Sequence, residues 1–157
     1  MASKIEVDEI FNAGGDNDTG IDLATNDQIL LKVANATRLT MNSTGQTTIV
    51  GEGGTTTTSL QQGLLKMWVQ LNGTGTIATQ DSFNASTLTD NGTGDYSVAI
   101  ANDMANDDYS VSGGGNSAQF IFDPVPTTSG ITMEISNSGG TQGDVTCVTA
   151  SIAGDLA

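Results

Sequence analysis

The chain has 157 residues, no histidine, one cysteine and a formal net charge of −14, from 18 acidic and 4 basic side chains. So few basic residues cannot neutralise a phosphate backbone, which excludes nucleic acid as a main partner, and an anionic membrane surface would repel the chain. Without histidine there is no imidazole base, no Ser–His or Cys–His pair and no His-ligated zinc, so we expect no catalytic residue and no cofactor.

The composition favours β-structure. Thr, Gly, Ser and Asn together make up 68 residues, or 43% of the chain, and these residue types suit turns and short strands better than helices. No apolar run approaches the roughly 20 residues that a membrane helix needs, so we expect no membrane insertion. The length predicts one domain, or one domain with a small appendage.

Charge is distributed unevenly along the chain. All four basic residues lie within residues 1–66, which carry a net charge of −4, whereas residues 67–157 contain ten acidic residues and no basic one. Carboxylates of the second region cannot form salt bridges within that region, so they must be solvated or hydrogen-bonded. The two regions therefore differ in chemistry.

The first 50 residues read as short strands separated by turns. Apolar and polar residues alternate from Lys4 to Phe11, a Gly/Asn/Asp cluster follows, and further strands are predicted at 28–33, 37–41 and 46–50. This region holds few large apolar side chains, so we do not expect it to be stable alone. Symmetric oligomerisation is a common way to complete such a core.

The rest of the chain divides into a linker and a larger domain. Residues 51–63 are rich in Gly and Thr and are interpreted as a linker. Residues 64–157 alternate well, and strands are predicted at 64–71, 76–83, 97–100, 109–112, 119–122, 131–136 and 144–153. This spacing is typical of a β-sandwich or barrel.

Two groups of acidic residues were considered as cation sites. The spacing of Asp16, Asp18, Asp22 and Asp27 loosely matches a calcium loop, but an EF-hand needs Gly at the sixth position, where Ile21 stands, and a Glu at the twelfth, where Asp27 stands. We interpret this segment as an acidic turn. The group at Asp103, Asp107 and Asp108 is interpreted as a solvated loop, so no metal site is predicted.

Two segments resemble virion proteins of tailed bacteriophages. DQILLKVANATRLTMNSTGQTTIVGEG, at 27–53, resembles the short stem repeat of tail fibres, with its Arg-Leu pair and Asn/Gly turns. KMWVQLNGTGTIATQDSFNASTLTDNGTGDYSVAIANDMANDDYSVSG, at 66–113, is similar to a C-terminal domain of tail-fibre-like proteins from marine phages and cyanophages, as the opening SKIEVDEI is to their N-termini.

The resemblance implies an all-β, trimeric, non-enzymatic structural protein at the surface of the phage particle. Its fold would be a short intertwined N-terminal β stem (1–50), the linker (51–63) and a C-terminal, jelly-roll-like β-sandwich (64–157). The implied role is a short fibre or spike that is anchored by its N-terminus and turns its β-domain toward the host. The implied partners are two further copies, other tail or capsid proteins and a host surface receptor.

Two other functions remain open. The first is a capsid decoration (cement) protein that stabilises the head, which would share the fold and the trimer. The second, more remote, is a polysaccharide depolymerase that uses paired carboxylates, although no motif selects a pair. The sequence does not identify receptor-contacting residues, and Trp68 reads as a packing residue, with a receptor-facing stack as the alternative.

Two sets of apolar residues are expected to act in assembly. One set would anchor the chain to the particle by insertion or by β-augmentation: Ile5, Val7, Ile10 and Phe11. The other set would pack around the threefold axis: Leu30, Val33, Leu39, Met41 and Ile49.

Overall fold

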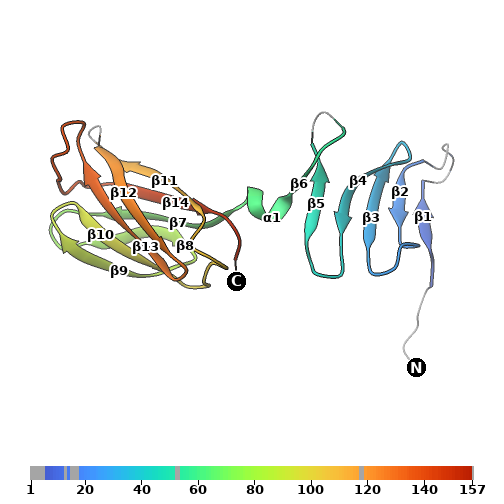
Figure 1. The fold of residues 1–157 in the computed structure, drawn as a ribbon, viewed down its shortest axis with the longest axis horizontal. Helices are drawn as coiled ribbons and strands as arrows, with labels where there is room; N and C mark the ends of the chain where they lie inside the picture. Colours follow the sequence, from blue (N-terminus) through green and yellow to red (C-terminus); the bar gives the residue numbers. More distant parts are fainter. Residues whose placement is uncertain (1–5, 13, 15–17, 52–53, 117–118, 157) are drawn as a thin grey trace, which may run out of the picture. The chain divides into compact units, whose positions relative to one another are not determined.

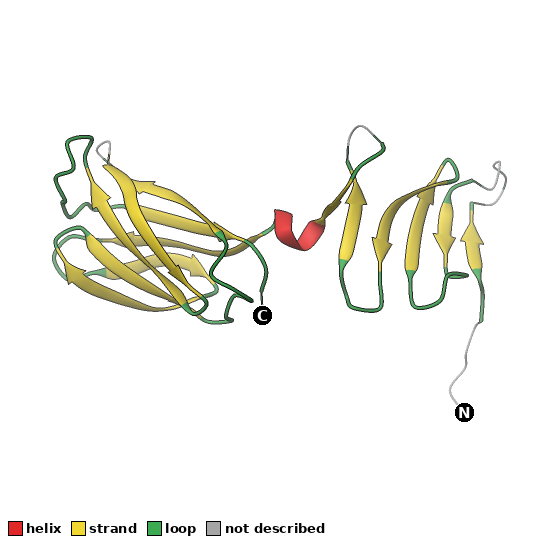
Figure 2. Cartoon of the chain, in the orientation of Figure 1, coloured by secondary structure: helices red, strands yellow, loops and turns green. Residues whose placement is uncertain are grey.

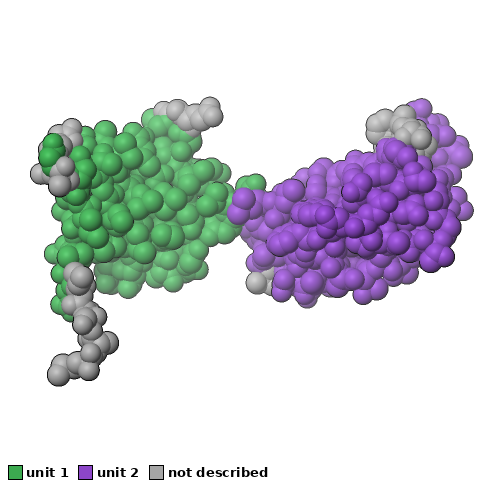
Figure 3. Space-filling model, turned by 180° about the vertical axis from the view of Figure 1, so that it is seen from behind, with its two compact units in different colours: residues 1–63 green, residues 64–157 purple. Residues whose placement is uncertain are grey.

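The computed structural model describes residues 6–12, 14, 18–51, 54–116 and 119–156. For residues 119–123 it describes the backbone alone. The chain forms two compact units, residues 1–63 and 64–157 (Figure 3). Strands make up nearly all of the regular structure, with one short helix, α1 (Figure 2). Every strand pairing is antiparallel, which confirms the all-β prediction.

The first unit is a six-stranded sheet in which each strand pairs with the next one along the chain (Figure 1). This order needs only short hairpin turns, so the sheet forms from local pairings within one chain. Its strands are β1 (Glu9–Phe11), β2 (Gly20–Asp22), β3 (Ile29–Val33), β4 (Ala36–Met41), β5 (Thr47–Val50) and β6 (Thr57–Ser59).

Turn residues fix the register of this sheet. Ala34 and Asn35 connect β3 to β4 and both have positive φ, of 53° and 56°, which is the geometry of a type I′ hairpin turn. At the next hairpin, Asn42 Oδ1 accepts hydrogen bonds from the backbone N–H groups of Thr44 and Gln46, an Asx-type turn. Local side-chain chemistry therefore sets which residues of β3, β4 and β5 face each other.

The stretch 51–63 differs from the linker that its composition suggested. Residues Thr57–Ser59 form β6, which pairs with β5, and Leu60–Gly63 form α1. Gln61 of this helix accepts a hydrogen bond from Thr47 N–H (3.0 Å) and donates one to Gly45 O (2.9 Å). The Gly/Thr-rich stretch thus closes the first unit, because backbone pairing does not depend on apolar side chains.

The second unit contains eight strands in the order β8-β7-β14-β11-β12-β13-β10-β9 (Figure 1). The sheet folds over, so that β10 and β13 lie across from β7 and β14 and one core fills the space between them. Its strands are β7 (Leu65–Asn72), β8 (Ala78–Phe83), β9 (Ala85–Gly92), β10 (Asp95–Ile100), β11 (Ser110–Gly115), β12 (Gln119–Thr127), β13 (Gly130–Ser136) and β14 (Val148–Ala153).

The core of the second unit consists of alternate residues of β7, β10, β13 and β14, together with Met104 from a loop. This is the pattern expected when each strand turns one face inward. Its buried members are Met67, Val69, Leu71, Tyr96, Val98, Ile100, Met104, Ile131, Met133, Ile135, Val148, Ala150 and Ile152. Ile77 and Val145 are partly buried against it.

Besides β6, two strands and one strand extension were not predicted from the sequence. β2 lies in the Gly/Asp-rich stretch, and β9 has the polar sequence ASTLTDNG. β12 continues through Pro124 and Pro126, with an irregular register between Phe122 and Val125. In each case pairing with a neighbouring strand overrides weak local propensity.

A polar contact ties together the turns at one end of this core. The Tyr96 hydroxyl donates to Asp144 Oδ1 (2.9 Å) or to Gly73 O (3.1 Å), and the same Asp144 oxygen accepts Gly94 N–H (2.8 Å). A Cβ on Gly73 would collide with the Tyr96 hydroxyl, so only glycine fits there.

In the described part of the chain, no helix has the length and apolar character needed to cross a membrane.

Candidate assembly surface

An apolar row crosses five of the six strands of the first unit. Ile10 lies opposite Ile21, which lies opposite Leu31, and the row continues through Leu39 to Ile49. Residues that lie directly opposite each other in a sheet project from the same face. The five side chains therefore form one continuous line, which ends at Thr58 on β6.

Further apolar residues extend this row along the strands. Ile29 pairs with Met41, two residues from Leu31 and Leu39 and hence on the same face, and Val33 flanks the row at the other end. We call this surface the apolar face, and its residues are Ile10, Ile21, Ile29, Leu31, Val33, Leu39, Met41 and Ile49.

The apolar face is not covered within its own unit. The exposed fractions of Ile10 and Val33 are 51% and 50%, and those of Ile29, Leu31 and Met41 lie between 37% and 40%. Among the described residues of the first unit no hydrophobic side chain is buried, whereas the second unit has a full core. A sheet needs a layer packed against one face to hold its strands together, so this face calls for a partner.

The opposite face of the same sheet is polar. Glu9, Asp22, Leu30, Thr40, Thr48 and Ser59 lie in register across it, so Leu30 is the one apolar member of this row. Phe11 and Val50 also lie on this face, beside the row. They alternate in sequence with the residues of the apolar face, as expected for a sheet with one solvated side.

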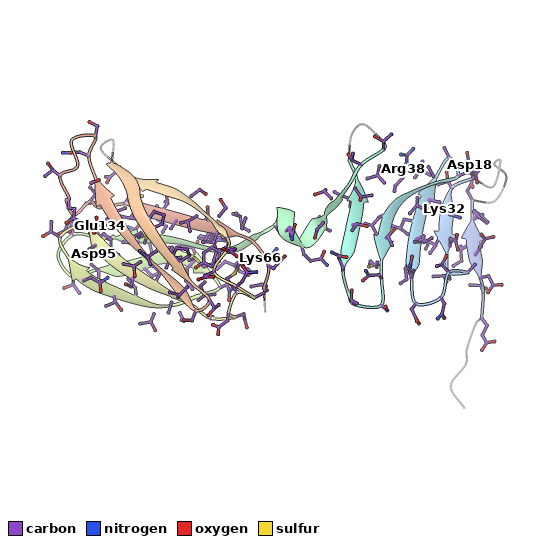
Figure 4. All side chains as sticks on the ribbon, in the orientation of Figure 1. Asp18, Lys32, Arg38, Lys66, Asp95 and Glu134 are labelled. Carbon is purple, nitrogen blue, oxygen red and sulfur yellow. The ribbon has the colours of Figure 1, made fainter. Side chains whose placement is uncertain are left out.

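A salt bridge on the polar face joins two adjacent strands. Lys32 Nζ lies 2.5 Å from Asp22 Oδ2, and Asp22 Oδ1 accepts the Ala24 N–H. The Lys32 side chain is labelled in Figure 4. The hydrogen bond from Lys32, with that from Ala24, lowers the pKa of Asp22, and the bond to Asp22 raises the pKa of Lys32. Asp22 is 6% exposed and is one of the four acidic residues in the segment interpreted from the sequence as an acidic turn; here it pairs with Lys32.

The residues expected at the threefold axis divide between the two faces. Val33, Leu39, Met41 and Ile49 lie on the apolar face, but Leu30 lies on the polar face, opposite Asp22 and Thr40. The sequence prediction gave 28–33 as one strand with apolar residues at consecutive positions, and it did not divide them between two faces. It also missed Ile21 and Leu31, which the register places on the row.

The residues expected to anchor the chain are also separated. Ile10 belongs to the apolar face, whereas Phe11 lies opposite Gly20 on the polar side, and Val7 precedes β1 with an exposed fraction of 44%. Ile5 lies outside the described residues. β1 pairs with β2 along one edge, so a partner strand would have to add to its other edge.

The second unit carries fewer features that suggest chemistry. A shallow groove of about 230 Å³ lies over the outer side of β9, β10 and β13 and is lined by small and hydroxylated residues, among them Thr89, Ser97 and Thr132. In the part of the chain that the structure describes, no three His, Cys, Asp or Glu side chains gather as metal ligands would.

Comparison of the chain with protein-family models, with curated proteins and with solved structures gave no match.

Proposed function

We propose that the chain is a non-enzymatic structural protein of a tailed-phage particle, a short trimeric fibre- or spike-like appendage on the virion surface. The observation that carries this proposal is the contrast between the two units. The first presents an uncovered apolar face, and the second has a complete core of its own. The threefold symmetry of the trimer is part of this proposal, and so is a jelly-roll-like fold for the second unit.

The energetics of the apolar face support association of several copies. Burial of apolar surface contributes roughly 25 cal/mol per Å², and eight large aliphatic side chains on one sheet supply a continuous patch of the kind that marks association sites. Because the strands of one chain pair with each other, three sheets, each built by a single chain, would pack face to face. This replaces the intertwined stem expected from the sequence.

In this proposal the start of the chain attaches the trimer to the particle. Val7 and the free edge of β1 are the described parts of that attachment, and Ile10 contributes to the trimer instead. Residues 64–157 would then project, and their ten acidic side chains against the single basic Lys66 would keep the projecting domains solvated and apart.

A matched pair of substitutions tests the association. Leu30 and Leu31 are neighbours in β3 on opposite faces, so Leu31→Gln should convert the trimer to monomer while Leu30→Gln leaves it intact. Sedimentation equilibrium of the full chain measures this. A wild-type monomer, or equal effects of the two substitutions, would contradict the proposal.

A decoration protein of the capsid would use the same apolar face and the same trimer. The two roles differ in copy number, which densitometry of purified particles measures against the major capsid protein. A far smaller number supports the tail appendage, and a comparable number supports decoration.

Deletion of residues 1–8 should give a folded trimer that fails to enter particles.

A further inference from the structure

Two aromatic side chains lie next to each other on the outer face of the second unit. Met67, Val69 and Leu71 of β7 point into the core, so Trp68 between them points outward. Trp68 lies directly opposite Phe83 of β8. Phe83 has an exposed fraction of 55%, and Trp68 is partly exposed.

This pair is not required by the core. The chain has only one tryptophan, two tyrosines and four phenylalanines, and both tyrosines pack in or against the core. The exposed phenylalanine beside the sole tryptophan leaves apolar ring surface in contact with water, which is unfavourable in free energy. Burial of the two rings in the core would have avoided this cost.

Polar side chains continue the same outer face away from the aromatic pair. Ser151 lies opposite Trp68, and Ser112 lies opposite Ser151. A second row runs parallel to the first, from Asp81 through Gln70 to Thr149. The face therefore combines a small aromatic platform with two lines of hydroxyl, amide and carboxylate groups.

Several of these polar groups are held in place by neighbours. The hydroxyls of Ser112 and Ser151 are 3.0 Å apart, Thr149 Oγ1 donates to Gly114 O, and Gln70 Nε2 donates to Cys147 Sγ. Each hydroxyl group has one donor and two acceptor sites. A hydroxyl that is fixed by one hydrogen bond to a neighbour can therefore still form a second one to a ligand.

We propose that this face binds a neutral saccharide, with a sugar ring stacked on Trp68 and Phe83 and its hydroxyls bonded to the adjoining polar rows. A sugar has an apolar C–H face and a polar rim, which matches an aromatic pair bordered by Ser, Thr, Gln and Asp. The aromatic platform is two residues wide, far smaller than the apolar centre of a stable protein interface.

Charge selects the class of saccharide. Lys66, two residues before Trp68 in β7, is the one basic residue of the second unit, and it is buried, with its Nζ donating to Leu64 O. Residues 67–157 carry ten acidic groups and no basic one, and Asp81 lies on the face itself. Sulfated or uronic-acid polymers and phosphate-bearing ligands would be repelled. The inference deepens the proposed host-facing role and depends on that role only for the source of the sugar, a glycan of the host surface.

The sole tryptophan makes the test direct. The fluorescence of Trp68 in the full chain is titrated with laminarihexaose, maltohexaose and chitohexaose, and with hexagalacturonate as the anionic probe. We expect a saturable change in emission with at least one neutral hexasaccharide and weaker or no binding of hexagalacturonate. No saturable change with any of the three neutral sugars overturns the proposal.

Variants locate the binding. Phe83→Ala should weaken the affinity about tenfold, which corresponds to about 1.4 kcal/mol, and Phe83→Tyr should retain it. Val125→Ala is the matched control, because Val125 is 52% exposed and lies on a different strand, β12. Unchanged affinity in Phe83→Ala, with the fold checked by far-UV circular dichroism, overturns the assignment. Sedimentation of the same samples tests the trimer separately.

Discussion

Single residues in the second unit show how a polar group is accommodated in an apolar core. Tyr96 is fully buried, and its hydroxyl contacts Asp144 and Gly73 O. Burial, and then the neighbouring Asp144 carboxylate, raise the pKa of the Tyr96 hydroxyl far above its ordinary value of 10.0. Burial likewise raises the pKa of Tyr109. Both phenols therefore stay protonated in the folded chain over the whole neutral range.

Removal of the Tyr96 hydroxyl should destabilise the second unit. Tyr96→Phe leaves the buried Gly73 carbonyl and Asp144 without this donor, so we expect a loss of about 1–2 kcal/mol in the free energy of unfolding. Urea denaturation followed by circular dichroism measures the loss. Tyr109→Phe is the comparison, since its hydroxyl bonds to Thr127 O and Gly130 O nearer the surface and should cost less. Equal losses would contradict the special role of the Tyr96 contact.

At the scale of elements, the first sheet depends on links between strands on its polar face. The Asp22–Lys32 pair joins the three-residue strand β2 to β3. The pKa of Asp22 is lower in the folded chain than its ordinary value of 3.8. Its contribution to stability is therefore present above that value and is lost as the pH falls through the lowered pKa.

Asp22→Asn should remove this acid dependence. We expect the variant to be less stable than the wild type at neutral pH and the difference to disappear at strongly acidic pH, where the wild-type carboxylate is also protonated. Thermal melts that follow the unfolding of the first unit at a series of pH values measure this difference. Asp27→Asn serves as the control, because Asp27 is exposed and forms no salt bridge among those the structure describes. A constant difference at all pH values would contradict the role of the charge.

At the scale of the whole molecule, the two units have different sources of stability. Among its described side chains, the second unit buries thirteen hydrophobic residues within one chain, so its unfolding should be a property of the single chain. The first unit has its apolar face uncovered, so its stability should come from association and follow mass action.

Calorimetry of the full chain should therefore show two transitions. The melting temperature of the first unit should rise with protein concentration, whereas that of the second unit should stay fixed. Leu31→Gln should lower or abolish the concentration-dependent transition and leave the other unchanged, and Leu30→Gln should affect neither strongly. A single transition that is independent of concentration would show that the first unit is stable without a partner.

Local patterns in the sequence were sufficient for much of this description. Alternation in 64–71 and 131–136 predicted the strands β7 and β13, because the side-chain period of a strand is two. Turn chemistry at Asn35 and around Gly45 marked the hairpins of the first sheet. The all-β class, the shortage of apolar residues in 1–50 and the charge difference between the two parts all follow from composition.

The tertiary structure decided what depends on which strands are neighbours. Alternation within β3 cannot say whether Leu30 or Leu31 faces a partner; the register with β2 and β4 does. β2 and β9 exist because adjacent strands offer backbone hydrogen bonds to polar sequences. In the same way, the pairing of β7 with β8 brings Trp68 beside Phe83. Such pairings join residues far apart in the chain, and short-range propensity carries no information about them.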